Sequence, residues 1–213
     1  MSGKQNIVKG NRKKRYCLAV AVIQGGVKMR ITVNSVTIGC IKGNIVEQRD
    51  LEAVVNAANA QLMAGGGVAG AIHKTAGPEL AEECKPLAPI RPGEAVITGG
   101  HKLPNEYVIH CLGPVYGSDE PAEELLASCY KKALSLAEDR KIHSIGFPAL
   151  STGAFGYPME RAAEVAFRSI KESIPAVNHV KMIRFVLFDR KSQQIHEKKI
   201  KEIFSDTEYI EST

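Results

Sequence analysis

The chain has 213 residues, of which 44% are hydrophobic and 24% charged, and its formal net charge is +5. This length suits one substantial hydrophobic core rather than two, and the composition is that of an ordinary globular domain. No apolar run approaches the roughly 20 residues that a membrane span needs, and residues 1–15 lack the hydrophobic segment of a signal peptide. We expect a cytoplasmic protein, with the nucleus as the alternative, that has a basic tail over residues 1–15 and one domain over residues 16–213.

The first half of the chain predicts four strands and two helices. The expected strands cover residues 16–23, 27–33, 36–41 and 53–56, and the helices cover residues 68–75 and 79–85. Gly25-Gly26 and Asn34-Ser35 are turn signals between strands, and Gly77-Pro78 ends the first helix.

From residue 94 onward, strands alternate with longer helices. Strands are expected over residues 94–98, 107–112, 144–148 and 182–188, and helices over residues 121–141, 158–173 and 192–204. Such alternation is typical of an α/β fold. We therefore predict a three-layer α/β/α sandwich around a central mixed, largely parallel sheet.

Five cysteines occur singly, with no CxxC pair, at positions 17, 40, 84, 111 and 129. Most of them lie in apolar strand or helix patterns, which is typical of reduced, buried thiols. A zinc site would require a tight cluster of cysteines and histidines, which the sequence lacks. We therefore predict no metal site.

The most informative stretch joins two carboxamides to a glycine triplet. Asn56-Ala57-Ala58-Asn59 ends a strand, and Gly65-Gly66-Gly67-Val68 opens a helix shortly afterwards. Unpaired N–H groups and the helix dipole make such a helix start a site for anions. Nearby carboxamides can bind hydroxyl groups or ring nitrogens without adding charge.

A second glycine-rich loop follows the strand that ends at Pro148. Ser151-Thr152-Gly153 offers hydroxyl and backbone donors for a second phosphate. Ligands of open α/β sheets bind beyond the carboxyl ends of the strands, where both loops are expected. Two phosphate loops at one crevice would suit a diphosphate.

Two other readings of these motifs fit less well. Gly65-x-Gly67-x-x-Gly70 matches a dinucleotide fingerprint, but a long loop precedes it and no acidic residue follows at the expected distance. Ser151, Asp189 and His196 follow the order of a hydrolase triad, but His196 falls within an amphipathic helix, where we expect it on the surface.

Several motifs in register resemble the macrodomain family, and the likeness extends from about Val36 to Phe204. They are Asn56-Ala57-Ala58-Asn59, Gly65-Gly66-Gly67-Val68, Gly113-Pro114 and Phe147-Pro148-Ala149-Leu150-Ser151-Thr152-Gly153-Ala154-Phe155-Gly156-Tyr157-Pro158. Ala71-Ile72-His73 and the residues around Tyr157 are most similar to the MacroD-type branch.

The resemblance implies a pocket for ADP-ribose and no cofactor. One side of the diphosphate would contact Gly65, Gly66, Gly67 and Val68, and the other Ser151, Thr152, Gly153, Ala154 and Phe155. Asn59 would hold the distal ribose, and Phe155 would pack against it. Phe188 would lie on the adenine, or alternatively in the core at the end of a strand. Asn44, Ile45 and Asn56 complete the expected binding residues.

Two departures from the family pattern affect these expectations. Asn44 stands where the family usually has an aspartate that accepts a hydrogen bond from the adenine amino group. A neutral acceptor is weaker by about 1 kcal/mol. Ala69 stands where MacroD-like hydrolases carry an aspartate that orients water, which leaves His73 without an acidic partner one turn away.

The resemblance therefore implies a hydrolase that releases ADP-ribose from modified acidic side chains or from O-acetyl-ADP-ribose. Asn59 would position the ribose, a water held by the substrate's phosphate would attack, and His73 would be an auxiliary group. The alternative is a non-catalytic reader of ADP-ribose or ADP-ribosylated proteins. The basic chain ends leave open a module for poly(A) or RNA, although no aromatic-studded basic groove accompanies them.

Overall fold

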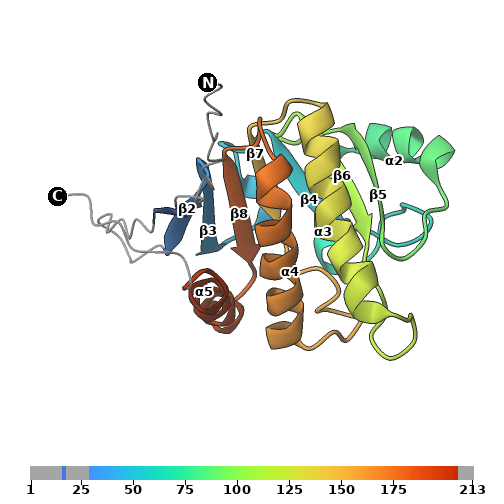
Figure 1. The fold of residues 1–213 in the computed structure, drawn as a ribbon. Coiled ribbons are helices and arrows are strands. Elements are labelled where there is room, and N and C mark those ends of the chain that lie inside the picture. Colours follow the sequence, from blue (N-terminus) through green and yellow to red (C-terminus); the bar gives the residue numbers. More distant parts are fainter. Residues whose placement is uncertain (1–15, 18–28, 206–213) are drawn as a thin grey trace, which may run out of the picture.

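The structure, a computed structural model, describes residues 16–17 and 29–205. Eight strands within these residues form one sheet, in the order β1-β2-β3-β8-β7-β4-β6-β5 (Figure 1). They are β1 (Tyr16–Cys17), β2 (Arg30–Val33), β3 (Val36–Lys42), β4 (Ala53–Ala57), β5 (Glu94–Gly99), β6 (Tyr107–Leu112), β7 (Ser144–Phe147) and β8 (Met182–Leu187). The neighbours from β3 to β6 pair in parallel, and the pairs at both edges are antiparallel. The predicted mixed, largely parallel sheet is confirmed.

Helices cover both faces of this sheet (Figure 1). They are α1 (Gly67–Ala76), α2 (Pro78–Cys84), α3 (Ala122–Asp139), α4 (Met159–Ser173) and α5 (Arg190–Phe204), with 3-10 turns η1 (Ile45–Glu47), η2 (Lys85–Leu87) and η3 (Ile174–Ala176). Helices α3, α4 and α5 pack on one face through the larger core cluster, while α1 and α2 pack on the other through a smaller one. This arrangement is the predicted three-layer sandwich.

Aromatic rings fill the centre of the larger core. Phe185 on β8 lies between Phe147 on β7 and Phe167 on α4, with ring centroids 5.8 Å and 4.8 Å away. All three side chains are fully buried. A central parallel strand is covered on both faces, which explains why the run over β8 is almost continuously apolar.

The first hairpin has the turn that its sequence predicts. Asn34 and Ser35 have φ angles of 48° and 69°, and they join β2 to β3 with Val33 opposite Val36. Two residues with positive φ match a type I′ turn, whose twist suits an antiparallel hairpin. In the described residues the strand expected over residues 27–33 begins at Arg30. The tail over residues 1–15, the Gly25-Gly26 turn and residues 18–23 lie outside the described residues.

The last strand in the chain and the helix that follows it differ from the prediction in their bounds. Strand β8 ends at Leu187, and α5 begins at Arg190, two residues earlier than expected. Asp189 causes the early start, because its Oδ1 accepts a hydrogen bond of 2.8 Å from the backbone N–H of Ser192 and so caps the helix. Phe188 is left outside both elements.

The expectation of a surface His196 is wrong. The side chain is 1% exposed and packs against Phe167 and Phe185, and its Nδ1 lies 2.9 Å from the carbonyl oxygen of Ser192. Burial lowers the pKa of this imidazole from 6.5 to about 4. The helix periodicity alone does not reveal that α5 turns this position toward the core.

Four of the cysteines are buried free thiols, as predicted: Cys40, Cys84, Cys111 and Cys129. Burial raises the pKa of Cys84 to about 11 and that of Cys129 to about 12, so both thiols stay protonated. Among residues 16–17 and 29–205, no cluster of histidine, cysteine or acidic side chains could hold a metal ion. The same residues include no helix long and apolar enough to cross a membrane.

Candidate functional site

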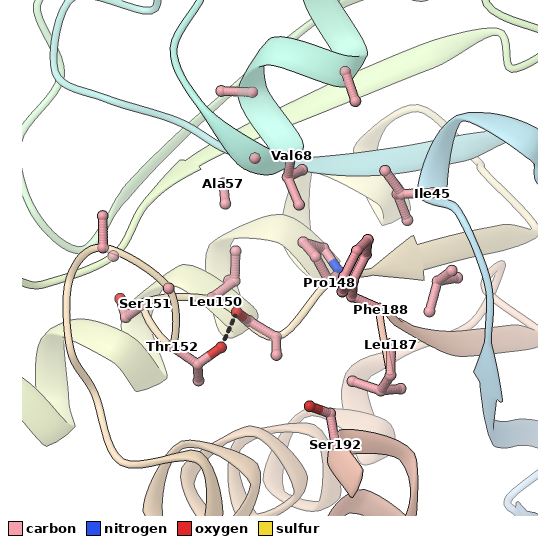
Figure 2. Close-up of a pocket in the computed structure, with 18 of the residues that line it drawn as sticks. Ile45, Ala57, Val68, Pro148, Leu150, Ser151, Thr152, Leu187, Phe188 and Ser192 are labelled. Carbon is pink, nitrogen blue, oxygen red and sulfur yellow. Dashed lines mark hydrogen bonds between the residues drawn. The ribbon is translucent and has the colours of Figure 1, made fainter. Parts of the chain in front are cut away.

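A cavity of about 840 Å³ lies at the carboxyl ends of the parallel strands. Each of the five central strands is followed by at least one lining residue. These residues are Gly43 after β3, Ala58 after β4, Gly113 after β6, Pro148 after β7 and Phe188 after β8. Figure 2 shows Val68 and Ala57 on one side of the cavity and Thr152 and Ser192 on the opposite side. The crevice therefore lies where an open α/β sheet is expected to bind a ligand.

Most of the residues predicted for the site line this cavity. They are Asn44, Ile45, Asn59, Gly65, Gly66, Gly67, Val68, Ser151, Thr152, Gly153, Ala154, Phe155 and Phe188. Asn56 and His73 do not line it, and both side chains are buried. The two glycine-rich loops are brought together because β4 and β7, which precede them, are parallel neighbours.

The glycine triplet forms the start of α1. Gly66 is the N-cap residue, without a side-chain hydrogen bond to the helix, and Gly67 has a φ of +55°. One turn later, a Cβ on Gly70 would overlap the carbonyl oxygen of Gly65. The absence of a capping side chain leaves the first N–H groups of α1 available to an anion in the cavity.

The second loop makes a tight turn after β7. Ser151 has a φ of +63°, and Thr152 donates a hydrogen bond of 2.9 Å from Oγ1 to the carbonyl oxygen of Ala149 (Figure 2). Two backbone hydrogen bonds of 3.0 Å close the turn, from Gly156 to Gly153 and from Tyr157 to Ser151. The Ser151 hydroxyl is buried and has no partner among the described residues. Backbone geometry thus fixes this loop against the cavity.

The structure does not assemble the Ser151, Asp189 and His196 triad. Ser151 and Asp189 line the cavity, whereas His196 lies in the core against Phe167. Asp189 is engaged in capping α5. Ser151 consequently has no histidine base within this arrangement.

Asn59 stabilises the loop that precedes the glycine triplet. Its Nδ2 donates to the carbonyl oxygen of Met63 at 2.8 Å, and its Oδ1 accepts from the N–H of Met63 at 3.1 Å. One amide hydrogen and one lone pair remain for a ligand, because a carboxamide offers two of each. Asn59 can therefore shape the cavity wall and bind a hydroxyl group at the same time.

Asn44 caps η1 on another side of the cavity. Its Oδ1 accepts from the N–H of Val46 at 3.4 Å, and its Nδ2 donates to Oε1 of Glu47 at 3.1 Å. Asn44 is exposed, so its carboxamide stays accessible from the cavity.

Phe188 is 91% exposed and lines the cavity. The alternative of a core phenylalanine at the end of a buried strand is therefore wrong. The ring is therefore accessible to a ligand in the cavity. Its flat face suits stacking on a purine.

Few ionisable side chains line the cavity. Within residues 16–17 and 29–205 they are Lys42, Cys111 and Asp189. Burial raises the pKa of Cys111 well above its usual range, and the Ser192 backbone N–H lowers that of Asp189. Ala69, 5% exposed on the first turn of α1, supplies no acid. The described residues that line the cavity therefore include no histidine and a single carboxylate, that of Asp189, which caps α5.

His73 and Asn56 belong to a buried polar cluster behind the cavity. His73 lies edge-on to His110, with ring centroids 6.5 Å apart, and Nδ2 of Asn56 lies 3.1 Å from Nδ1 of His110. Thr98 and Cys84 complete the cluster around Nε2 of His110. Nε2 of His73 has no partner among the described residues, and burial lowers the pKa of this side chain.

Sequence reasoning missed several lining residues. Ala57, Ala58, Gly113, Pro148, Leu187, Asp189 and Ser192 all line the cavity. Except for Asp189 and Ser192, they lie at the ends of central strands or directly after them, so the position of each strand end was the signal that could have identified them.

Comparisons with known proteins agree with this geometry. The model of the Macro domain family matches residues 55–166. A Macro domain-containing protein of Methanosarcina mazei is 46% identical over 171 residues, covering 80% of this chain and 90% of that protein.

Solved structures show the same fold. The Oceanobacillus iheyensis macrodomain with ADP has a TM-score of 0.80 and 37% identity, covering 84% of this chain and 97% of that one. The Trypanosoma brucei macrodomain in complex with ADP-ribose has a TM-score of 0.70 and 37% identity, covering 76% of this chain and 68% of that one. The chain therefore belongs to the Macro domain family.

Proposed function

We propose that this chain binds ADP-ribose, free or attached to a protein, and hydrolyses its ester linkages. The observation that carries the proposal is the cavity in which two glycine-rich loops meet, with the exposed ring of Phe188 at its rim. Solved macrodomains of two organisms that hold ADP or ADP-ribose support the same ligand class.

Each part of ADP-ribose has a matching feature in the cavity. The start of α1 and the loop from Ser151 to Phe155 would hold the diphosphate through backbone N–H groups, since Lys42 is the one cationic lining residue described. Phe188 would stack on the adenine. Asn59 would bind the distal ribose with its remaining amide hydrogen and lone pair.

Hydrolysis would depend on positioning rather than on a protein base. Ala69 cannot orient water, and His73 is buried and does not line the cavity. A water held by the diphosphate would attack at the distal ribose that Asn59 fixes in place. Attack on the anomeric carbon breaks its bond to the carboxylate oxygen and releases the acidic side chain, whereas attack on the acyl carbon of an O-acetyl ester releases acetate and the free ribose hydroxyl; in both, the water supplies the oxygen and the proton. Orientation and preorganised N–H groups can supply large accelerations without a general base.

Ala69 also supports a second candidate, a reader that binds ADP-ribosylated proteins without cleaving them. General acid–base help is worth about 10²–10⁴-fold in rate, so its loss could reduce turnover below any useful level. Binding would remain, because the loops and Phe188 are intact.

Calorimetric titration with ADP-ribose, alongside single-turnover release from a glutamate-modified protein, tests the proposal. Phe188→Ala should weaken binding about ten-fold, because stacking on a base is worth about 1–3 kcal/mol. Leu87→Ala is the control, since Leu87 is an exposed apolar residue that does not line the cavity.

Binding with release would support a hydrolase, and binding without release a reader. Lack of binding would contradict both. A steep salt dependence with poly(A) binding would instead favour a nucleic-acid module, because each neutralised phosphate releases counterions.

A further inference from the structure

The strands that form the cavity carry polar residues directly behind its lining. On β4, Asn56 precedes the lining residue Ala57, and on β6, His110 precedes the lining residue Cys111. Asn56 and His110 are opposite each other in the parallel pairing of these strands, and both side chains are 0% exposed. Two buried polar side chains thus meet where the strands enter the cavity wall.

A threonine hydroxyl determines the hydrogen positions of this cluster. Oγ1 of Thr98 lies 3.1 Å from the carbonyl oxygen of Gly99, to which it can only donate, and 2.8 Å from Nε2 of His110. A hydroxyl that gives its one hydrogen to Gly99 accepts from Nε2–H of His110. Nδ1 of a neutral His110 then carries a lone pair and accepts from Nδ2 of Asn56 at 3.1 Å.

The other polar atom of the Asn56 carboxamide is unpaired. With Nδ2 of Asn56 directed at His110, Oδ1 must point the other way, and it has no partner among the described residues. Burial lowers the pKa of His110 to about 3, so the ring stays neutral at physiological pH. Cys84 Sγ, 3.8 Å from Nε2, and the edge of His73 enclose the same ring.

The structure assigns His110 as a positioning residue: Thr98 holds it in the Nε2–H tautomer, and through Asn56 it fixes the ends of β4 and β6 that form the cavity. His110 touches no ligand in this role. It acts on Ala57 to Asn59 through Asn56, and on Cys111 to Gly113 through its own strand. The effect of His110 on ligand binding rests on the proposed ADP-ribose function, whereas the assignment of its tautomer is independent of that function.

Two substitutions of Thr98 distinguish a positioning role of His110 in ligand binding from a role in the stability of the fold alone. Thr98→Val keeps the side-chain shape but removes the hydroxyl that selects the tautomer, and Thr98→Ser keeps the hydroxyl. Thr32→Val is the matched control, because Thr32 is a partly buried threonine on β2 whose hydroxyl meets that of Thr37. Each variant is examined by nitrogen-15 NMR of the histidine rings, calorimetry with ADP-ribose, and thermal unfolding.

We expect the unmodified chain to show Nε2–H for His110. Thr98→Val should lose this single tautomer and bind ADP-ribose about five-fold more weakly while still folded. Thr98→Ser should restore both properties, and Thr32→Val should change neither.

An Nδ1–H tautomer in the unmodified chain would overturn the assignment. So would a Thr98→Val variant that loses thermal stability but binds ADP-ribose with unchanged affinity, since the cluster would then be purely structural. If the unmodified chain binds no ADP-ribose, the proposed function fails, and the tautomer is still decided by the spectrum.

Discussion

Gly70 packs so closely against Gly65 that a Cβ at position 70 would overlap the Gly65 carbonyl oxygen. The spacing that imitates a dinucleotide fingerprint therefore has a local cause, which is the return of the loop onto its own helix. Gly70→Ala should displace the loop and weaken ADP-ribose binding about ten-fold, by analogy with small displacements of positioned groups. Calorimetry measures this change. Gly39→Ala should leave affinity unchanged, because Gly39 lies on the β2–β3 hairpin and does not line the cavity; its Cβ would meet Cγ of Arg30 at 3.1 Å and the carbonyl oxygen of Met29 at 3.4 Å.

Gly66 offers a test of the diphosphate site that spares the fold. A Cβ there meets nothing within 4 Å, and the backbone φ of −82° suits any residue. Gly66→Glu should weaken ADP-ribose binding about 100-fold or more by like-charge repulsion, while Gly66→Gln, of equal size, should lose much less. Equal losses in the two variants would mean that bulk rather than charge decides, and unchanged affinity in Gly66→Glu would place the diphosphate elsewhere.

Asn59→Ala should lower the single-turnover rate more than the affinity for ADP-ribose. Positioning of the distal ribose matters most in the transition state, and the diphosphate and adenine contacts are retained. The variant also loses both hydrogen bonds to Met63, so Met63→Ala, which keeps the backbone partners of those bonds, is the comparison. Parallel losses of rate and affinity would argue against a positioning role.

Asn44→Asp should bind ADP-ribose more tightly than the unmodified chain, by about five-fold, since a charged acceptor strengthens a hydrogen bond to the adenine amino group. Glu47 complicates the change, because its Oε1 lies 3.1 Å from Nδ2 of Asn44 and would repel a new carboxylate. The gain should therefore be largest in the double variant with Glu47→Gln. A double-mutant cycle by calorimetry measures the coupling, and no gain in the double variant would contradict the assigned adenine contact.

Buried histidines should make the fold less stable in mild acid. Burial lowers the pKa of His196 to about 4 and that of His110 to about 3, whereas both titrate near 6.5 when unfolded. Between those values the unfolded chain binds more protons, so stability is present above about pH 6.5 and is lost as the pH falls. Each histidine should cost about 2 kcal/mol between pH 7 and pH 5.

Urea unfolding at the two pH values measures this loss. His196→Leu should remove the part of this loss that comes from His196. The free energy of unfolding should then depend less on pH, whatever the effect of the substitution on stability at pH 7. An unchanged dependence would show that His196 can become protonated without unfolding.

Much of the fold followed from local patterns in the sequence. Apolar runs and turn residues located the strands and helices of the described part to within a few residues, and the alternation of strands with helices predicted the layers. The two glycine-rich loops, each following a strand, were sufficient to predict that both line one crevice, as they do. These features are local because they depend on backbone preferences and periodicity.

Tertiary structure decided which way individual side chains face. Phe188 is 91% exposed at the cavity and His196 is buried in the core, although the sequence pattern allowed the opposite for each. His73 and Asn56, placed in the site by their motifs, lie instead in the buried cluster around His110. Motifs specify which residues are near a site, but exposure and hydrogen-bond partners depend on how strands distant in sequence pair and pack, and no local pattern contains that information.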